Sequence, residues 1–384
     1  MRYVDEFREP DAARALARSI AAAVDPARSY NLMEFCGGHT HALCRFGLED
    51  VLPVNVRMIH GPGCPVCVLP TGRLDMAIDL VTRRREVILA TYGDLMRVPG
   101  SGGATLLSAK SQGGDVRMIY STAQAVALAE QNPDREVVLF AIGFETTTPP
   151  TAAAVKSAAQ KGLSNFSVFC NHVLTPAAID AIMTTGSGET GARLDGFVGP
   201  GNVSTIIGAE AYQAPAQTWA KPIVISGFEP NDLLESILRL IRQINQGQAR
   251  VENAFARAVR PGGNAQAQAL CADVFAVRDS FEWRGLGAIP QSALRLADAY
   301  QAYDAEAKFD LAYIPRPDHK ACQCASVLRG EIEPRDCKVF AGACTPEHPL
   351  GSCMVSPEGA CAAYYAYGRF RDAIQTPLTA AAAE

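Results

Sequence analysis

The chain has 384 residues, a formal net charge of −5 and a hydrophobic content of 48%. This length predicts two or three domains, with a core large enough to need no stabilising disulfides. Basic residues form no stripe, so we expect no nucleic-acid partner. No run approaches the ~20 apolar residues of a membrane span, and the charged N-terminus has no apolar signal segment. We therefore expect no membrane partner and a cytoplasmic location.

Strands and helices alternate along most of the sequence. A helix is expected over residues 11–24. Apolar runs that end in turns or lead into a helix predict strands at 30–35, 56–59, 86–90 and 117–120. Similar runs predict further strands at 137–142, 167–170, 194–198 and 222–226, and an amphipathic helix at 232–246. This alternation is typical of βαβ units and parallel sheets.

We interpret the fold class as α/β, with two related parallel-sheet βαβ domains and a C-terminal domain of loops and helices. The relationship is suggested by Gly-Pro-Gly turns after strands at 61–63 and 199–201. The expected divisions are an N-terminal helical segment that packs on the C-terminal domain (1–27), α/β domain I (28–132), α/β domain II (133–250) and a helical, cysteine-rich domain with an alanine-rich tail (251–384).

Half of the twelve cysteines lie in the last quarter of the chain: Cys322, Cys324, Cys337, Cys344, Cys353 and Cys361. The C-x14-C-x6-C-x16-C spacing of Cys322, Cys337, Cys344 and Cys361 supplies four thiolates, enough for a [4Fe–4S] cluster. Zinc also takes four thiolates, but usually from short C-x2–4-C pairs. The long spacing favours the cluster. Two cysteines are then left over. A spare thiol beside the cluster would link electron transfer to a disulfide; the alternative is that it is a small buried residue.

The sequence Cys64-Pro-Val-Cys67 is a C-x-x-C motif that follows a predicted strand. We interpret it as a redox-active dithiol in which a nearby helix start lowers the pKa of one thiol. Half of a metal site and a structural role are the alternatives.

The sequence Cys36-Gly-Gly-His39-Thr-His41 also follows a predicted strand. Cys36 is a candidate nucleophile or metal ligand, and His39 a candidate base, hydrogen-bond donor or second ligand. The alternative is a packed turn with inactive side chains. Ligands of parallel sheets collect at the carboxyl ends of the strands, where Cys36 and Cys64 should both lie. His60 is interpreted as a strand-end residue, and Gly100–Gly103 as a flexible loop without a phosphate-binding motif.

Taken together, these motifs resemble the HypD family of [NiFe]-hydrogenase maturation factors. The resemblance extends from about residue 28 to residue 368. It is carried by Cys36–His41, by Gly61-Pro-Gly-Cys-Pro-Val-Cys67, by Gly143-Phe-Glu-Thr-Thr-Thr148, and by the cysteine array with the segment from Cys344-Thr-Pro-Glu to Cys361.

The resemblance implies a redox-active assembly scaffold rather than a conventional enzyme. A HypC-like chaperone would pair with the chain, and the complex would carry an additional iron. This iron would receive two cyanides and one carbon monoxide, giving Fe(CN)2CO, before delivery to the hydrogenase large subunit. A HypE-like partner, working with HypF, would donate the cyanide.

By the same resemblance, Cys36 would be a ligand of the carrier iron, shared with a chaperone cysteine and supported by His39. Cys64 and Cys67 would form the redox pair. The ligands of a [4Fe–4S] cluster would be Cys322, Cys337, Cys344 and Cys361. Two other hypotheses remain open from the residues: a stand-alone iron–sulfur thiol-disulfide oxidoreductase, and a binding module structured by zinc.

Overall fold

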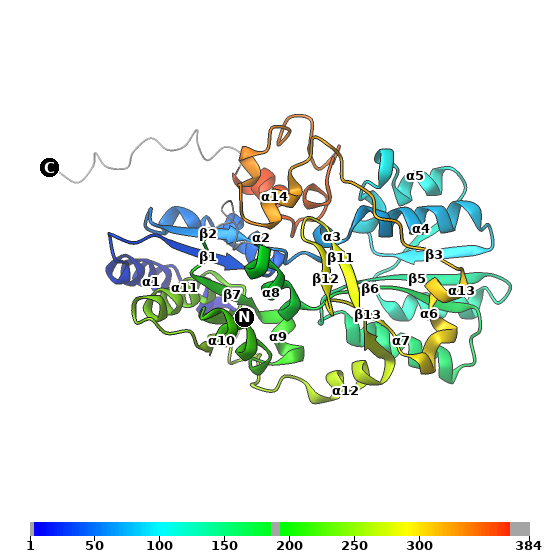
Figure 1. Cartoon of the computed structure of the whole chain (residues 1–384), viewed down its shortest axis with the longest axis horizontal. Coiled ribbons are helices and arrows are strands. Elements are labelled where there is room, and N and C mark those ends of the chain that lie inside the picture. Colours follow the sequence, from blue (N-terminus) through cyan, green and yellow to red (C-terminus); the bar gives the residue numbers. More distant parts are fainter. Residues whose placement is uncertain (1–3, 186–192, 369–384) are drawn as a thin grey trace.

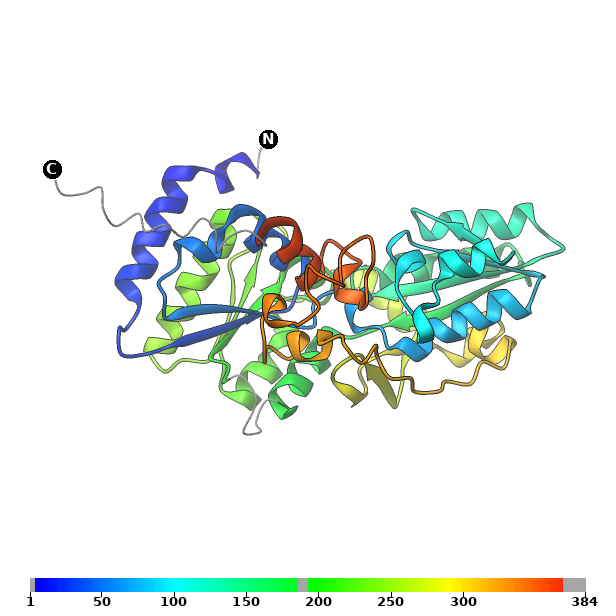
Figure 2. The ribbon, with the colours of Figure 1, turned by 90° about the horizontal axis from the view of Figure 1, so that it is seen from above.

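Two α/β lobes lie side by side, and the cysteine-rich C-terminal segment lies between them (Figures 1 and 2). The computed structural model describes residues 4–185 and 193–368. Each lobe is built on one parallel sheet whose strands are connected through helices. The predicted α/β class with parallel βαβ sheets is confirmed, as is the loop-rich and helical character of the C-terminal region.

Sheet A contains five parallel strands in the order β2-β1-β7-β8-β9. The strands are β1 (Tyr30–Glu34), β2 (Val56–His60), β7 (Gly196–Pro200), β8 (Ile223–Ser226) and β9 (Val251–Asn253). The helical elements of this lobe are η1 (Asp5–Phe7), α1 (Pro10–Ala23), α2 (Gly37–Phe46), η2 (Leu48–Val51), α9 (Gly201–Ile207), η5 (Glu210–Tyr212), α10 (Gln213–Trp219) and α11 (Pro230–Asn245).

Sheet B contains four parallel strands in the order β4-β3-β5-β6. The strands are β3 (Val87–Thr91), β4 (Asp115–Met118), β5 (Glu136–Gly143) and β6 (Phe166–His172). The helical elements around it are α4 (Thr71–Arg83), η3 (Asp94–Arg97), η4 (Ser101–Gly103), α5 (Leu106–Ser111), α6 (Thr122–Gln131) and α7 (Thr148–Gln160). Helix α8 (Thr175–Thr185) follows β6 but packs against α10 of the sheet A lobe. Strands β3 and β6 are buried at every position, which explains why apolar residues dominate both.

The sheets do not follow the expected division of the chain at residues 132 and 133. That division placed β1 to β4 in one domain and β5 to β8 in another. Instead, β1 pairs with β7, and β3 pairs with β5. The chain leaves sheet A after β2, completes sheet B, and then returns. Both Gly-Pro-Gly turns consequently belong to sheet A, and they do not mark equivalent positions in two domains.

The N-terminal helix α1 packs on α11 of sheet A, and not on the C-terminal domain as expected. Leu16 and Ile20 of α1 share an apolar cluster with Ile237 and Leu238 of α11. Pro10 begins α1 at a position where the missing N–H costs nothing, and Pro230 begins α11 in the same way. Burial of their facing apolar sides holds the two helices together.

The region after β9 contains more strand than its predicted helical character implied. Two short antiparallel pairs follow helix α12 (Ala265–Val274): β10 (Phe275–Val277) with β13 (Leu294–Leu296), and β11 (Ser280–Trp283) with β12 (Gly287–Pro290). The remaining elements are short: η6 (Asp298–Tyr303), α13 (Ala305–Lys308), α14 (Cys324–Leu328), η7 (Pro334–Asp336), η8 (Ser352–Met354), α15 (Ala360–Ala363) and η9 (Tyr364–Gly368). The tail expected at 369–384 lies outside the described residues.

Candidate metal and thiol centre

The two N-terminal cysteine motifs meet at the carboxyl edge of sheet A. Cys36 lies two residues beyond β1, and the Gly61–Cys67 motif begins directly after the parallel strand β2. The Gly37 N–H donates to the Gly63 carbonyl at 3.2 Å. A Cβ atom on Gly63 would lie 2.2 Å from the Cys36 nitrogen. Glycine at 63 therefore lets the two turns pack backbone to backbone, and their predicted common edge is confirmed.

Cys36 is the N-cap residue of α2, and its side chain is half-buried. Burial, followed by the charges of Glu358 and Glu34, raises the pKa of the Cys36 thiol to about 12. The backbone N–H groups of Gly38 and His39 favour the thiolate, but they are outweighed. A thiolate at this position would therefore need a nearby cation to stabilise it.

The two glycines after Cys36 make room for neighbouring side chains. A Cβ atom on Gly37 would lie 2.5 Å from the Glu358 Cβ, and one on Gly38 would lie 2.9 Å from the Phe228 ring. The sequence suggested that these glycines admit a ligand. In the structure they admit Glu358 and Phe228, which pack close to the Cys36 turn.

His39 lies beneath the Cys36 turn, fully buried. Its ring packs against Phe228 with centroids 4.9 Å apart, and its Nε2 lies 3.3 Å from the Ser226 carbonyl oxygen. Among the described residues its Nδ1 has no hydrogen-bond partner. Burial lowers the pKa of His39, so the ring is neutral at pH 7. This geometry suits a support for the Cys36 turn better than an exposed base.

A chain of buried polar groups below Cys36 was not recognised in the sequence. The Glu34 carboxylate accepts the Cys36 N–H at 2.7 Å and lies 3.0 Å from His60 Nδ1. His60 Nε2 lies 3.2 Å from the Tyr364 hydroxyl and 3.6 Å from the Glu49 carboxylate. Burial alone would lower the pKa of His60, but Glu34 and Glu49 raise it to about 10. The only sequence signal was a glutamate at the end of an apolar strand.

Cys64 and Cys67 lie at the two ends of the first turn of α3 (Pro65–Val68), both buried as free thiols. The Cys67 N–H donates to Cys64 Sγ at 3.3 Å. Burial, with the neighbouring Cys64, raises the pKa of Cys67 well above its usual value. For Cys67 this is opposite to the lowered pKa expected for one thiol of the pair. Its cause is that α3 is buried between the lobes.

The four cysteines proposed as cluster ligands line one small cavity. All four are free thiols: Cys322, Cys337, Cys344 and Cys361. Gly351 also lines the cavity, and a Cβ atom there would lie 2.4 Å from Cys322 Sγ. Within residues 4–185 and 193–368, no three Cys, His, Asp or Glu side chains are arranged to hold a single metal ion.

Cys324 and Cys353, the two remaining cysteines of the C-terminal region, form a disulfide that also lines this cavity. Their pairing explains why Cys322, and not Cys324, is available as the fourth thiol. The Ser352 hydroxyl donates to the Cys67 carbonyl at 3.1 Å, which holds the disulfide segment beside the C-x-x-C turn. The sequence suggested a spare thiol beside the cluster, but it did not show that the two spare cysteines pair with each other.

One segment, Gly351–Tyr364, touches every part of the centre. Cys353 belongs to the disulfide, and Cys361 lines the cavity. Between them, Glu358 packs on the Cys36 turn. The last residue, Tyr364, contacts His60. The cavity, the disulfide, the C-x-x-C pair and Cys36 therefore form one continuous, largely buried region between the lobes.

The comparison with known families agrees with this arrangement. The family model "HypD: Hydrogenase formation hypA family" matches residues 11–368. The chain belongs to the HypD family. It is 60% identical over 375 residues to the hydrogenase maturation factor HypD of Azotobacter vinelandii, covering 97% of this chain and 99% of that protein. The HypD of Escherichia coli K12 is 44% identical over 372 residues, covering 96% and 98%.

The Gly143–Thr148 motif of this HypD-family chain lies at the carboxyl edge of sheet B. Glu145 is buried, and its carboxylate accepts hydrogen bonds of 2.8 Å from the N–H and hydroxyl of Thr175. Burial raises the pKa of Glu145 to about 7. Gly143 has a φ of +139° and faces the Thr147 hydroxyl, which leaves no space for a side chain.

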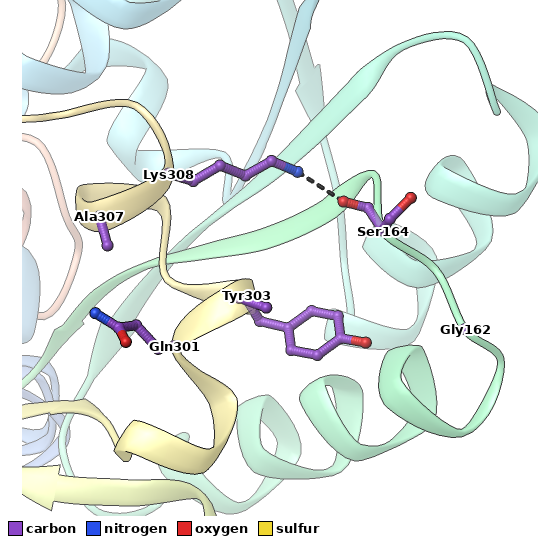
Figure 3. A pocket seen from close by; sticks show the side chains of 7 residues that line it. Gly162, Ser164, Gln301, Tyr303, Ala307 and Lys308 are labelled. Carbon is purple, nitrogen blue, oxygen red and sulfur yellow. Dashed lines mark hydrogen bonds between the residues drawn. The ribbon is translucent and has the colours of Figure 1, made fainter.

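A pocket at the opposite end of sheet B is not part of this centre. It is lined by Gln301, Tyr303 and Lys308, and the Lys308 amino group donates to the Ser164 carbonyl at 2.7 Å (Figure 3). Ser164 precedes β6, so the pocket is at the amino ends of the strands, away from the edge where parallel sheets bind ligands. Separately, no helix in the described ranges is both long and apolar enough to cross a bilayer.

Proposed function

We propose that this HypD-family chain is the scaffold on which the Fe(CN)2CO group of [NiFe] hydrogenase is assembled. A HypC-like chaperone would share the carrier iron, a HypE-like partner with HypF would donate cyanide, and the hydrogenase large subunit would receive the product. A cytoplasmic location is part of this proposal, because thiols remain reduced there.

One observation supports the proposal most: the segment Gly351–Tyr364 joins the four-cysteine cavity to the Cys36 turn. Such a connection is what a scaffold needs if electrons delivered to one site must act at another. The relatives named as hydrogenase maturation factors align with almost the whole chain, and therefore with every segment that forms this centre.

The donor set of Cys322, Cys337, Cys344 and Cys361, four free thiols that line one cavity, supports a [4Fe–4S] cluster held by these residues. In a cubane each thiolate binds a different iron, so the sulfurs need not converge on one point. A structural zinc usually takes its thiolates from short C-x2–4-C pairs, whereas these four cysteines are separated by 14, 6 and 16 residues. Gly351 leaves space beside Cys322 Sγ that a side chain would fill.

When bound, the cluster would supply single electrons to the neighbouring Cys324–Cys353 disulfide. Two electrons and two protons convert the Cys324–Cys353 disulfide to two thiols. Those thiols can in turn reduce an oxidised Cys64–Cys67 pair by disulfide exchange, which leaves Cys324 and Cys353 oxidised again. The C-x-x-C pair then lies beside Cys36, where the carrier iron is loaded.

Cys36 would hold the carrier iron as a thiolate. The iron would offset the burial and the negative charges of Glu34 and Glu358 that oppose ionisation of the free thiol. Cyanide and carbon monoxide favour low-spin iron(II), which suits a soft sulfur ligand. Since the described residues offer no three-ligand group at this position, further ligands would come from the chaperone and the diatomic molecules.

Infrared spectroscopy of the chain copurified with its HypC-like chaperone tests the proposal. We expect cyanide and carbonyl stretching bands in the complex, and their loss when the HypE-like cyanide donor is deleted. A complex that supports hydrogenase maturation but never shows these bands would refute the scaffold role.

The adjacent disulfide and C-x-x-C pair also fit a stand-alone thiol-disulfide oxidoreductase. That activity would reduce a disulfide substrate without any maturation partner. Turnover by the purified chain alone, with no diatomic bands in the complex, would favour this second function.

A further inference from the structure

A second cavity of about 560 Å³ opens beside the four-cysteine cavity. Its walls come from five parts of the chain: the start of α4 at Thr71, the loop Pro99–Gly103, Arg284, the segment Arg316–Lys320, and the pair Pro349–Leu350. The sequence suggested only a flexible loop at Gly100–Gly103. In the structure this loop forms one side of the cavity.

Only a thin wall separates this cavity from the cysteines. His319 lines the cavity, and its carbonyl accepts the Cys322 N–H at 2.8 Å. Leu350 lines it too, and its N–H donates to Cys344 Sγ at 3.3 Å. Two of the four cysteines are thus hydrogen-bonded directly to residues of the wall. Electrons arriving here would reach the cluster ligands through a single layer of chain.

The charge of this cavity is opposite to that of the molecule. Its lining contains three cations, Arg284, Arg316 and Lys320, and one carboxylate, Asp318, whereas the whole chain carries a net charge of −5. Arg316 is exposed and forms a long ion pair of 3.9 Å with Asp75. Lys320 is exposed and has no acidic partner in the described part of the chain.

The cavity is poorly suited to a small anion. The loop N–H of Ser101 donates to Asp75 at 2.8 Å, and the Thr71 hydroxyl donates to Asp318 at 2.8 Å. Arg284 is also paired with Asp318. The protein's own carboxylates thus occupy the inner donors that would bind a phosphate. The exposed cations, Lys320 and the weakly paired Arg316, are at the rim, where they can meet a protein surface.

We propose that this rim is the docking site of the protein that supplies electrons to the cluster, and that this donor is an acidic iron–sulfur protein. The inference rests on the cluster of the proposed function. One electron leaves the donor's reduced centre and enters the cluster, whose total oxidation state falls by one. No bond is formed or broken. Complementary charge accelerates such encounters, and small interfaces are usual for them.

The test uses the full chain with its reconstituted cluster, and a plant-type [2Fe–2S] ferredoxin as the acidic donor. The rim variant is Arg316→Glu/Lys320→Glu. The control is Arg14→Glu/Arg18→Glu. It makes the same change in charge on exposed residues of helix α1, in the lobe of sheet A. At low salt we expect the rim variant to lower the second-order rate constant of reduction about 10- to 100-fold, and the control to change it less than about twofold. High salt should remove the difference.

Two further measurements separate the possible failures. A small uncharged reductant should reduce the cluster at the same rate in all three proteins; if it finds no reducible cluster, the proposed function fails. Calorimetric binding of oxidised ferredoxin then still decides the docking site, because it needs no electron transfer. Equal binding and equal rates in the rim variant and the unmodified chain, or an equal loss in the control, would overturn the inference.

Discussion

His60 Nδ1 lies 3.0 Å from a carboxylate oxygen of Glu34, and the two residues are direct neighbours at the ends of strands β2 and β1. Both are buried. Glu34 also holds the Cys36 N–H, and His60 also contacts Tyr364. The ion pair therefore joins the sheet edge, the Cys36 turn and the segment that follows Cys361.

The His60–Glu34 pair predicts a specific loss of stability with rising pH. Folding raises the pKa of His60 to about 10, so the folded chain keeps a proton that the unfolded chain releases above about pH 6.5. The stabilisation is complete below pH 6.5 and is lost as the pH approaches 10. From pH 7 to pH 8 we expect this group to reduce the free energy of unfolding by about 1 kcal/mol.

Anaerobic urea unfolding at pH 7.0, 7.5 and 8.0 measures this slope. The range stops at pH 8 because buried thiols with raised pKa values contribute above it. His60→Gln should flatten the slope, whereas His348→Gln, at an exposed histidine, should leave it unchanged. An unaltered slope in His60→Gln would show that the imidazole carries no extra proton.

Gly63→Ala should disturb the contact between the two N-terminal cysteine motifs. The new Cβ atom would lie 2.2 Å from the Cys36 nitrogen, so one backbone must move. We expect a loss of about 1–3 kcal/mol in the free energy of unfolding. Gly342→Ala is the control, because the nearest atoms there are 3.9 Å away. Denaturant unfolding compares them; equal stabilities would mean that the turns are not in close contact.

Replacement of Cys337 or Cys344 by alanine should abolish the cluster. Anaerobically purified chain should contain about four irons and four sulfides, and these variants should contain almost none. Cys170→Ala, at a buried cysteine of β6, and Cys324→Ala, at a disulfide cysteine, should keep them. Iron and sulfide analysis with the visible absorption band decides the matter. Full iron in Cys337→Ala would remove that residue from the ligand set.

Cys64 and Cys67 should form a reversible disulfide under mild oxidation. Because burial raises the pKa of Cys67, alkylation of the reduced Cys67 at pH 7 should be slow. Thiol trapping at defined redox poise, followed by mass spectrometry, measures both properties. The Cys324–Cys353 pair provides an internal comparison in the same sample. If Cys64 and Cys67 remain unpaired while Cys324 and Cys353 oxidise, the C-x-x-C motif is not a redox pair.

Cys36→Ala should leave the fold and the C-terminal cluster intact but remove the carrier iron. Its complex with the chaperone should lack the cyanide and carbonyl bands, and hydrogenase maturation should stop. His39→Ala should weaken the same bands less completely, because His39 supports the turn from below without facing the site. Normal diatomic bands in the Cys36→Ala complex would mean that another residue holds the iron.

Local sequence patterns predicted most of the strands and the common edge of Cys36 and Cys64. An apolar run followed by a turn marks the end of a strand, and the parallel arrangement then fixes on which edge the following residue lies. The spacing of the C-terminal cysteines likewise indicated four thiols that line one cavity.

The pairing of distant strands could not be predicted in this way. Neighbours along the chain, such as β2 and β3, belong to different sheets, and a local pattern does not contain that information. The Cys324–Cys353 bond was hidden for a related reason, since spacing does not determine disulfide connectivity. His60 resembled an ordinary strand-end residue until the fold brought Glu34, Glu49 and Tyr364 around it.

Because sheet A is interrupted in the sequence, its strands leave the ribosome at different times. Leu32 of β1 pairs with Gly196 of β7, so the first two strands must wait while the whole of sheet B is synthesised and folds. The segment that covers Cys36 and supplies the cavity cysteines emerges last. Throughout translation the early thiols therefore lack their final surroundings, and the centre is complete only on a finished chain.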